Sequence, residues 1–338
     1  MARLLLCCSV AMLSFSSSAL AQNQPPATSP TASGASAAID NTTQTEDVRF
    51  KNEAYDRMTV PVTLGGAGPY RFLVDTGADR TAISRELASR LKLPPGSDVS
   101  LHSIVGVSDV ATANVPELQL TRHSTKIADA PLLDSQNMGA DGILGTDSLY
   151  AQRVVFDFTS QTMSIVPSSA PDFHEEPGTI VVEARRRNGR LVVTDATANG
   201  HHVTVVLDTG SQVSIGNEAL RSALHNGELS GGFLPVEIES VTGDKLPGEV
   251  TFIRDLEVGG VSLKQLAVVF ASAHTFDQLK LNDRPALLLG MNAMRAFKKV
   301  SIDFTNLTLR VVVPEHSGLD TETAGPIGRA MTFRRSGS

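Results

Sequence analysis

Cysteine is nearly absent from this sequence. Of the 338 residues only Cys7 and Cys8 are cysteines, and both lie within the first eight positions. A chain that loses this start has no disulfide, no cysteine nucleophile and no thiolate metal site, so hydrophobic burial must stabilise it. Tryptophan is missing and aromatic residues make up 5% of the chain. Composition therefore indicates neither a base-stacking platform nor a sugar-stacking groove.

Positive charge is also scarce. Lysine and arginine number 29 against 36 acidic residues, which gives a net charge of -7. Because contacts to phosphate groups need clustered positive charge, we expect no nucleic-acid partner. With 41% apolar residues, a chain of this length is long enough for two globular domains of average size.

The first residues carry a processing signal. Arg3 precedes an apolar run from Leu4 to Phe15, and Ala19-Leu20-Ala21 offers a small-x-small cleavage site. This is the pattern of a secretory signal peptide. The run is shorter than the roughly 20 residues that span a bilayer, which disfavours an uncleaved anchor. Leu6, ahead of Cys7, disfavours a lipoprotein. We predict an exported protein, periplasmic or extracellular, with no stable membrane anchor.

Breaks in composition divide the rest of the chain. Stretches rich in Pro, Ala, Ser and Thr bury too little apolar surface to fold and are typical of flexible linkers. The predicted organisation is a signal peptide over 1–21, a flexible linker over 22–46, an N-terminal lobe over 47–166, an inter-lobe linker over 167–177, a C-terminal lobe over 178–313 and a polar tail over 314–338.

The two predicted lobes look like copies of each other. Three landmarks recur in the same order: Asp-Thr-Gly at 75–77 and 208–210, an apolar-apolar-Gly element at 143–145 and 288–290, and a strand-like segment at 154–163 and 300–309. Matched landmarks in one order indicate an internal duplication, with a period too long for a solenoid.

Strand patterns dominate both copies. The glycine-rich segment Gly65–Gly68 and the turn pair Asn199-Gly200 each separate two β-rich runs, which predicts a hairpin ending just before each Asp-Thr-Gly. Helical spacing occurs only in short segments such as Arg85–Leu91 and Glu218–Leu224. The sequence therefore predicts an all-β fold with short helices.

An acidic residue at the end of an apolar strand lowers stability unless its carboxylate is hydrogen-bonded. A single Asp-Thr-Gly could be a structural turn. At average composition, a chain of this length would contain the tripeptide about 0.07 times. Two occurrences at matching places favour a functional role for Asp75 and Asp208.

These residues carry a family resemblance. The segment Leu73–Thr81 resembles the active-site loop of retropepsin-like aspartic proteases, and Leu207–Ser211 is similar to the pepsin-like form of that loop. The elements at 143–145 and 288–290 resemble the strand that braces the loop. The resemblance implies two β-barrel-like acid-protease lobes related by a pseudo-twofold, in a monomer whose lobes pair within one chain. Pairing of each copy with its twin on another chain is the alternative.

The implied activity is that of an aspartic endopeptidase that needs no cofactor and no metal. Asp75 and Asp208 would share one proton and activate a water molecule against a peptide bond. The substrate would be a peptide or protein in extended conformation, cleaved best at acidic pH. By the same resemblance, Thr76, Gly77, Ala78, Thr209, Gly210 and Ser211 support the active-site loops, and Gly145 and Gly290 belong to the bracing elements.

A protease of this kind also needs a cover over the bound peptide. The candidate flaps are Ser103–Asp109 around Gly106 and Ser240–Lys245 around Gly243.

One position departs from the family pattern. Retroviral enzymes place an arginine after the bracing glycine, where it pairs with an acid of the loop; here Thr146 and Met291 stand in those places. Asp79 is thereby left with Arg80 as the candidate partner.

Other side chains give weaker signals. His201-His202 lacks a third metal ligand at suitable spacing. Ser84 and Ser211 lack the glycines of a nucleophile elbow. We expect Asp157 and Asp303 to bind backbone or solvent. The remaining histidines are expected at the surface: His102, His123, His174, His225, His274 and His316.

Two other functions stay open. A peptide-binding module could keep the protease fold without turnover. An actin-like ATPase also duplicates an Asp-containing loop, but it requires long helices, which the chain lacks, and ATP, which an exported protein seldom meets.

Overall fold

The computed structural model describes residues 3–5, 9–10, 46–49, 51–52, 58–120, 124–149, 152–170, 176–187, 189–224 and 229–314. Most of the predicted signal peptide, linker and polar tail lies outside these residues, as do His123, His174, His225 and His316. Strands dominate the described part, and its helices have four to six residues. None of those helices is long and apolar enough to cross a bilayer. The predicted all-β fold with short helices is confirmed.

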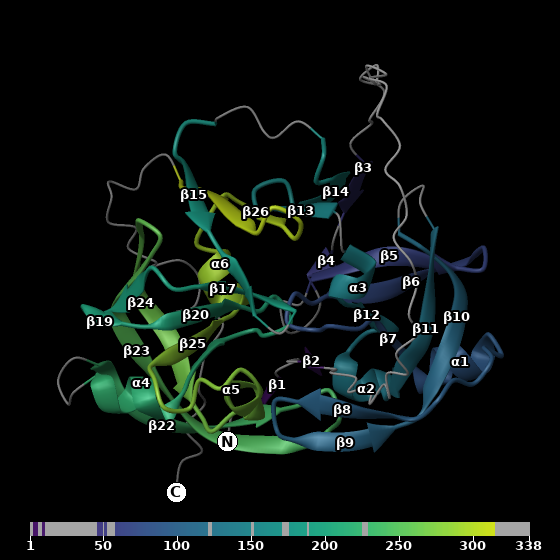
Figure 1. The fold of residues 1–338 in the computed structure, drawn as a ribbon, viewed down its shortest axis with the longest axis horizontal. Coiled ribbons are helices and arrows are strands. Elements are labelled where there is room, and N and C mark those ends of the chain that lie inside the picture. The colour runs from purple at the N-terminus through teal and green to yellow at the C-terminus, as the bar shows by residue number, and fades with distance from the viewer. Residues whose placement is uncertain are drawn as a thin grey trace, which may run out of the picture.

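Lobe 1 is a seven-stranded sheet, drawn in blue on the right of Figure 1. β10 pairs with both β11 and β5, which closes the sheet into a barrel. Its strands in spatial order are β10 (Thr112–Gln119), β11 (Ser124–Leu133), β7 (Ala82–Ser84), β12 (Gly142–Leu144), β6 (Ala67–Val74), β5 (Met58–Leu64) and β4 (Lys51–Asn52). Its helices are α1 (Arg85–Arg90), α2 (Ser135–Met138) and α3 (Thr146–Leu149).

Lobe 2 is an eleven-stranded sheet on the left of Figure 1. Its main path is β1 (Arg3–Leu5), β22 (Leu229–Glu239), β23 (Lys245–Val258), β24 (Val261–Phe270), β21 (Ser214–Gly216), β25 (Ala286–Leu289), β20 (Thr204–Leu207), β17 (Arg190–Val193) and β16 (Arg185–Arg187), with β18 (Ala196–Ala198) and β19 (His201–His202) beside it. Its helices are α4 (Glu218–Ala223), α5 (His274–Gln278) and α6 (Met291–Met294). Among the described residues no pairing closes this sheet, so the barrel expected in both lobes is formed in lobe 1 only.

A six-stranded sheet joins the two lobes at the top of Figure 1. Its order is β15 (Thr179–Glu183), β27 (Thr308–Val312), β26 (Lys299–Asp303), β13 (Gln152–Asp157), β14 (Thr162–Pro167) and β3 (Glu46–Arg49). The central pair, β13 with β26, consists of the two duplicated strands, which run antiparallel with Val155 opposite Ser301. The duplication therefore builds the joint between the lobes.

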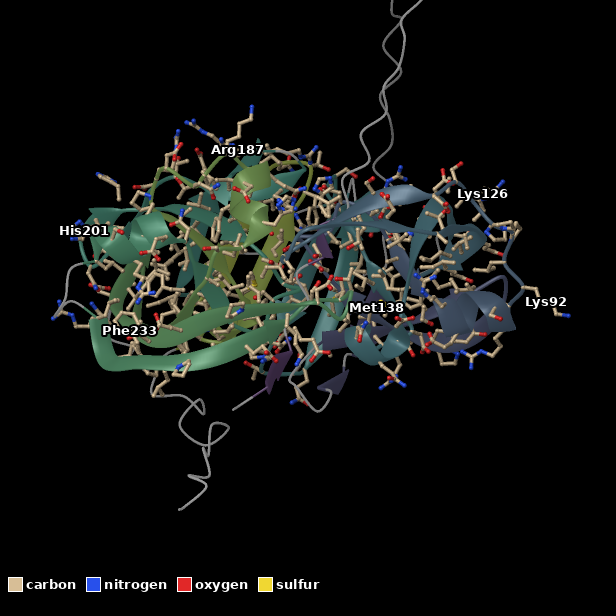
Figure 2. The ribbon with its side chains drawn as sticks, turned by 90° about the horizontal axis from the view of Figure 1, so that it is seen from below. Lys92, Lys126, Met138, Arg187, His201 and Phe233 are labelled. Carbon is tan, nitrogen blue, oxygen red and sulfur yellow. The ribbon has the colours of Figure 1, made fainter. Side chains whose placement is uncertain are left out.

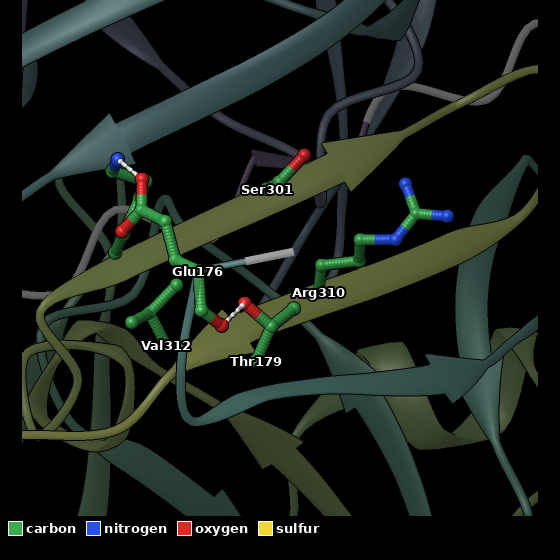
Figure 3. Close-up of a pocket in the computed structure, with 6 residues that line it drawn as sticks. Glu176, Thr179, Ser301, Arg310 and Val312 are labelled. Carbon is green, nitrogen blue, oxygen red and sulfur yellow. Dashed lines mark hydrogen bonds and ion pairs between the residues drawn. The ribbon is translucent and has the colours of Figure 1, made fainter. Parts of the chain in front are cut away.

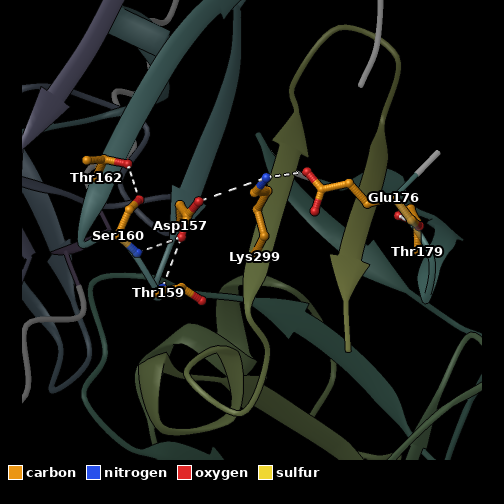
Figure 4. A network of polar contacts seen from close by, with 7 residues as sticks. All are labelled: Asp157, Thr159, Ser160, Thr162, Glu176, Thr179 and Lys299. Atoms are coloured by element: carbon orange, nitrogen blue, oxygen red, sulfur yellow. Dashed lines mark hydrogen bonds and ion pairs between the residues drawn. The ribbon is translucent and has the colours of Figure 1, made fainter. Parts of the chain in front are cut away.

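The outer face of this sheet carries a polar network. Lys299 lies 2.5 Å from a Glu176 oxygen and 3.9 Å from Asp157 Oδ2, so it links strands from the two halves (Figure 4). The Asp157 carboxylate also accepts backbone bonds from Thr159 and Ser160 at 3.0 and 2.9 Å. Asp303 caps its own turn in the same way. Both aspartates bind backbone, as predicted.

A small pocket opens beside this network (Figure 3). It is lined by Glu176, Thr179, Lys299, Ser301, Arg310 and Val312. None of the predicted site residues lines this pocket.

A fourth, three-stranded sheet consists of β2 (Ser9–Val10), β8 (Val99–Ser103) and β9 (Val107–Val110). β1 pairs with β22 in parallel and β2 pairs with β8 antiparallel. The start of the chain thus adds a short strand to a hairpin of each lobe.

Local signals explain the elements that flank the two Asp-Thr-Gly loops. The two predicted turns are formed, with φ values of +56° and +77° at Gly65-Gly66 and +48° and +85° at Asn199-Gly200. Ser84 caps α1 by accepting a bond from the Leu87 amide at 3.1 Å, and Asn217 caps α4 through the Leu220 amide at 2.8 Å. The two caps repeat at the same spacing as Asp75 and Asp208.

The apolar core runs through the whole molecule. One cluster of buried side chains includes Phe72 and Leu144 of lobe 1, Leu207 and Leu289 of lobe 2, and Phe156 of the joining sheet. Lys92 and His201 lie at opposite outer ends of the molecule, with Met138 between them (Figure 2). The centre, where the lobes meet, holds the predicted site.

Candidate active site

Each aspartate stands where a buried strand ends. β6 ends at Val74, and the Asp75 amide then donates to the Leu144 carbonyl of β12 at 3.1 Å. β20 ends at Leu207, and the Asp208 amide donates to Leu289 of β25 at 3.0 Å. The parallel pairings β6–β12 and β20–β25 therefore position both loops by the same device.

The two carboxyl groups meet at the lobe interface. Asp75 is 0% and Asp208 1% exposed. A methyl group added at Gly77 would lie 2.7 Å from Asp208 Oδ1 and 3.2 Å from Asp75 Oδ1, so both side chains border one point. A methyl group at Gly210 would overlap the Asp75 carboxyl. Only glycine at these two positions leaves room for the loops to approach the carboxyl groups. Two carboxylates that are this close together and this buried cannot both be charged at low cost.

Each carboxylate is also fixed within its own loop. The Gly77 amide donates to Asp75 Oδ1 at 2.8 Å, and the Gly210 amide donates to Asp208 Oδ1 at 3.0 Å. These backbone amides hold each carboxylate in one orientation.

The two threonines bind the loops to each other. The Thr76 amide donates to Thr209 Oγ1 at 2.9 Å, and the Thr209 amide donates to Thr76 Oγ1 at 3.0 Å. The hydroxyls donate onward across the interface, from Thr209 to the Val74 carbonyl at 2.9 Å and from Thr76 to the Leu207 carbonyl at 3.3 Å. These four reciprocal bonds form a nearly symmetric cross-link directly beneath the aspartates.

The bracing glycines touch the backbone after each loop. A methyl group at Gly145 would lie 2.6 Å from the Arg80 carbonyl oxygen, and one at Gly290 would lie 2.7 Å from the Val213 carbonyl oxygen. The next residues continue the contact, because the amide of Thr146 donates to Ala78 and the amide of Met291 donates to Ser211, both at 2.8 Å.

Four supporting side chains were missed from the sequence. Thr81 binds Asp147 Oδ1 through its amide at 2.9 Å and its hydroxyl at 2.6 Å, and Ser214 binds Asn292 Oδ1 with both groups at 2.9 Å. The two hydroxyls in turn accept bonds from the bracing glycine amides, each at 3.1 Å. Their signal was present, since Thr81 and Ser214 stand six residues after their aspartates and Asp147 and Asn292 two residues after their glycines.

A comparison with protein families agrees with this geometry. The family model described as aspartyl protease matches residues 60–148 and 194–293, together more than half of the chain. The chain belongs to the aspartyl protease family. Each matched region holds one Asp-Thr-Gly loop and one bracing glycine, so this aspartyl protease is of the two-lobed, retropepsin-like kind. A search of curated proteins found no match to the chain.

Asp79 has an unexpected neighbour. Burial raises the pKa of its carboxyl from 3.8 to about 6; the Arg190 cation opposes the rise, Asp147 adds to it, and Arg80 opposes it with a smaller effect. Arg190 thus has a larger effect on the pKa of Asp79 than Arg80, the partner suggested by sequence. Arg190 comes from β17 of lobe 2, is 1% exposed, and donates from Nε to the Gly77 carbonyl at 3.1 Å. It therefore links lobe 2 to the active-site loop of lobe 1.

The two predicted flaps lie at hairpin tips. Gly106 is in the turn between β8 and β9, where its carbonyl accepts a bond from the Ser103 amide at 2.7 Å. Gly243 is in the turn between β22 and β23, and its amide donates to Ser240 at 2.9 Å. Ile104 and Val241, on these tips, are both 0% exposed.

His102 and His274, expected at the surface, are half-buried and face each other. His102 Nδ1 lies 3.0 Å from His274 Nε2, and the two rings stack with centroids 5.3 Å apart. The pairing joins a lobe 1 strand to a lobe 2 helix, which sequence spacing cannot reveal. His201 and His202 form the short strand β19. The described residues contain no group of three or more His, Cys, Asp or Glu side chains that could hold a metal ion.

Proposed function

We propose that the protein is an aspartic endopeptidase that hydrolyses peptide bonds with a water molecule activated between Asp75 and Asp208. The observation that carries the proposal is the pair of buried carboxyl groups bordering one point, held by reciprocal threonine bonds. Two such groups share one proton, so that one is a base and the other an acid.

The residues divide the reaction between them. The charged carboxylate takes a proton from water, and the protonated partner donates to the carbonyl oxygen of the scissile bond, with no covalent intermediate. The amides of Gly77 and Gly210 keep each carboxylate in place throughout. A pair that must hold one proton favours turnover at acidic pH, and the substrate is a peptide or protein in extended conformation.

The proposal includes where the enzyme acts. The processing signal at residues 1–21 supports export to the periplasm or the extracellular space. Cross-lobe bonds within one chain support a monomer, since neither Asp-Thr-Gly loop is left to pair with a second molecule.

The test is cleavage of a peptide library by the wild type and by Asp75→Asn and Asp208→Asn. Either substitution removes one of the two carboxyl groups that share the proton, so no acid–base pair remains. We therefore expect turnover to fall by at least about 1,000-fold with the fold retained. Inhibition by a statine-type transition-state analogue should accompany wild-type activity.

A matched control is Asp157→Asn. Asp157 is a duplicated aspartate whose carboxylate caps a turn in the joining sheet. Its substitution should leave cleavage intact. If the wild type binds peptides but never cleaves them, the chain is a binding module on the same fold. Cleavage that survives Asp75→Asn or Asp208→Asn would exclude the two-acid mechanism.

A further inference from the structure

The dyad is covered in this conformation. Since Asp75 and Asp208 have almost no exposed surface, a peptide and a water molecule reach them only after a cover moves. The candidate covers are the two hairpin tips, each of which inserts an apolar residue into the opposite lobe.

The insertions are reciprocal. Ile104, on the lobe 1 tip, joins a lobe 2 cluster that contains Val213, two residues after the second active-site loop. Val241, on the lobe 2 tip, joins a lobe 1 cluster that contains Ala78 of the first active-site loop. Both hairpins thus reach across the interface beside the active-site loops.

The two tips are held differently. The Gly243 tip lies against Asn137 of α2, a neutral side chain. The Ile104 tip lies against α5, where the His274 amide donates to the Ile104 carbonyl at 2.8 Å. Beside that bond His102 of β8 faces His274 at 3.0 Å, so a pair of titratable rings holds the lobe 1 tip.

A bond between two imidazole nitrogens needs one donor and one lone pair. With both rings protonated, each facing nitrogen carries a hydrogen, and the bond is replaced by repulsion between two cations. We propose that the His102–His274 pair is a latch that holds the lobe 1 hairpin closed at neutral pH and releases it in acid.

The groups around His102, on β8, agree with release of the latch in acid. Burial, His274 and Arg190 each lower the pKa of His102, so its protonation requires acid and adds a cation next to two others. On the α5 side, His274 Nδ1 lies 3.6 Å from Asp277 Oδ2, so the carboxylate of Asp277 faces the second ring of the pair. The bond is lost when both rings carry a proton, because neither facing nitrogen then has a lone pair.

The latch rests on the proposed protease function, and it would open the site under the acidic conditions in which the dyad works. Its test does not depend on cleavage. In the full chain carrying Asp75→Asn, amide hydrogen exchange is measured at pH 7 and pH 5 and corrected for the intrinsic rates. The reporter is the amide of residue 274, which donates to Ile104.

We expect its protection to fall about three- to tenfold from pH 7 to pH 5, the effect of losing one hydrogen bond. His102→Asn should abolish this pH dependence, because the Asn amide group can bond to either form of His274. His274→Gln should also abolish the pH dependence, because the Gln amide group can bond to either form of His102. This variant replaces His102→Asn if that one fails to fold.

Two internal controls accompany the measurement. The Gly243 amide in the other tip, bonded to Ser240 at 2.9 Å, should keep its protection. His201→Gln, at the outer end of lobe 2 (Figure 2), should behave as the parent. Equal protection of residue 274 at the two pH values, or a pH dependence that persists in His102→Asn, would overturn the latch. Neither result bears on whether Asp75 and Asp208 cleave peptides.

Discussion

At the scale of single residues, Arg190 is the link between the lobes that spacing did not reveal. Its guanidinium is buried, binds the loop carbonyl of Gly77, and acts on Asp79 from the other half of the molecule. A buried cation lowers the pKa of a nearby acid, so its effect is measurable at that acid.

Replacing Arg190 with Met should therefore raise the pKa of Asp79 above about 6. The physical reason is that the cation which opposes the effect of burial is removed. The titration can be followed by carbon NMR of the Asp79 carboxyl. Arg187→Met, on β16 close by in sequence, is the matched control and should leave the value unchanged; an unchanged value in Arg190→Met would contradict the assignment.

Asp79 also makes stability depend on pH. An acid whose pKa rises on folding from 3.8 to about 6 favours the folded state fully below pH 3.8, and this contribution is lost as the pH rises through about 6. The shift corresponds to a free energy of roughly 2–3 kcal/mol.

In Asp79→Asn the difference in unfolding free energy between pH 4 and pH 7 should change by about that amount, with the variant losing less stability as the pH rises. Urea unfolding at the two pH values measures it. Asp109→Asn, at an exposed aspartate of β9, should keep the wild-type difference. Identical pH dependence in Asp79→Asn and the wild type would count against a raised pKa.

At the scale of elements, the bracing strands show why glycine is required. In Gly145→Ala the new methyl group would meet the Arg80 carbonyl oxygen at 2.6 Å and the Thr81 amide nitrogen at 2.8 Å. Backbone atoms of a buried loop cannot move aside, so we expect a loss of about 1–3 kcal/mol or more. Chemical unfolding measures the loss of stability, and a peptide-cleavage assay measures the accompanying effect on activity.

Gly106→Ala is the matched control for that change. A methyl group at Gly106 would find no atom within 4 Å, so its stability should stay within about 1 kcal/mol of the wild type. Equal losses in the two variants would show that the clash at Gly145 is relieved by movement.

The sequence predicted elements with strong local signals and missed the rest. The turn pairs Gly65-Gly66 and Asn199-Gly200 and the capped helices α1 and α4 were found, because positive φ values and side-chain caps are local properties. The other helices have four or five residues, too few to show a helical period. The pairing of β13 with β26 depends on residues almost 150 positions apart, and only the fold brings them together.

The candidate site divides in the same way. Asp75, Asp208 and the two bracing glycines were found because the duplication repeats them in order. Arg190, His102 and His274 were missed because each acts across the lobe interface on a side chain that has no counterpart in the other copy.

At the scale of the whole molecule, the lobes share one core and one sheet. Because β13 pairs with β26 and one apolar cluster includes residues of both lobes, neither half is complete alone. We expect calorimetry to show a single cooperative unfolding transition. Two separate unfolding transitions would show instead that the lobes unfold independently.

The elution volume from a sizing column should match one chain, as bonds between the two loops within that chain predict.

The joining sheet also sets when the two lobes can be assembled. β26 and β27 belong to the C-terminal lobe, so β13 remains an open edge until the ribosome has made that lobe. A nascent chain therefore carries Asp75 and an unpaired sheet edge before the second lobe is there to cover either of them.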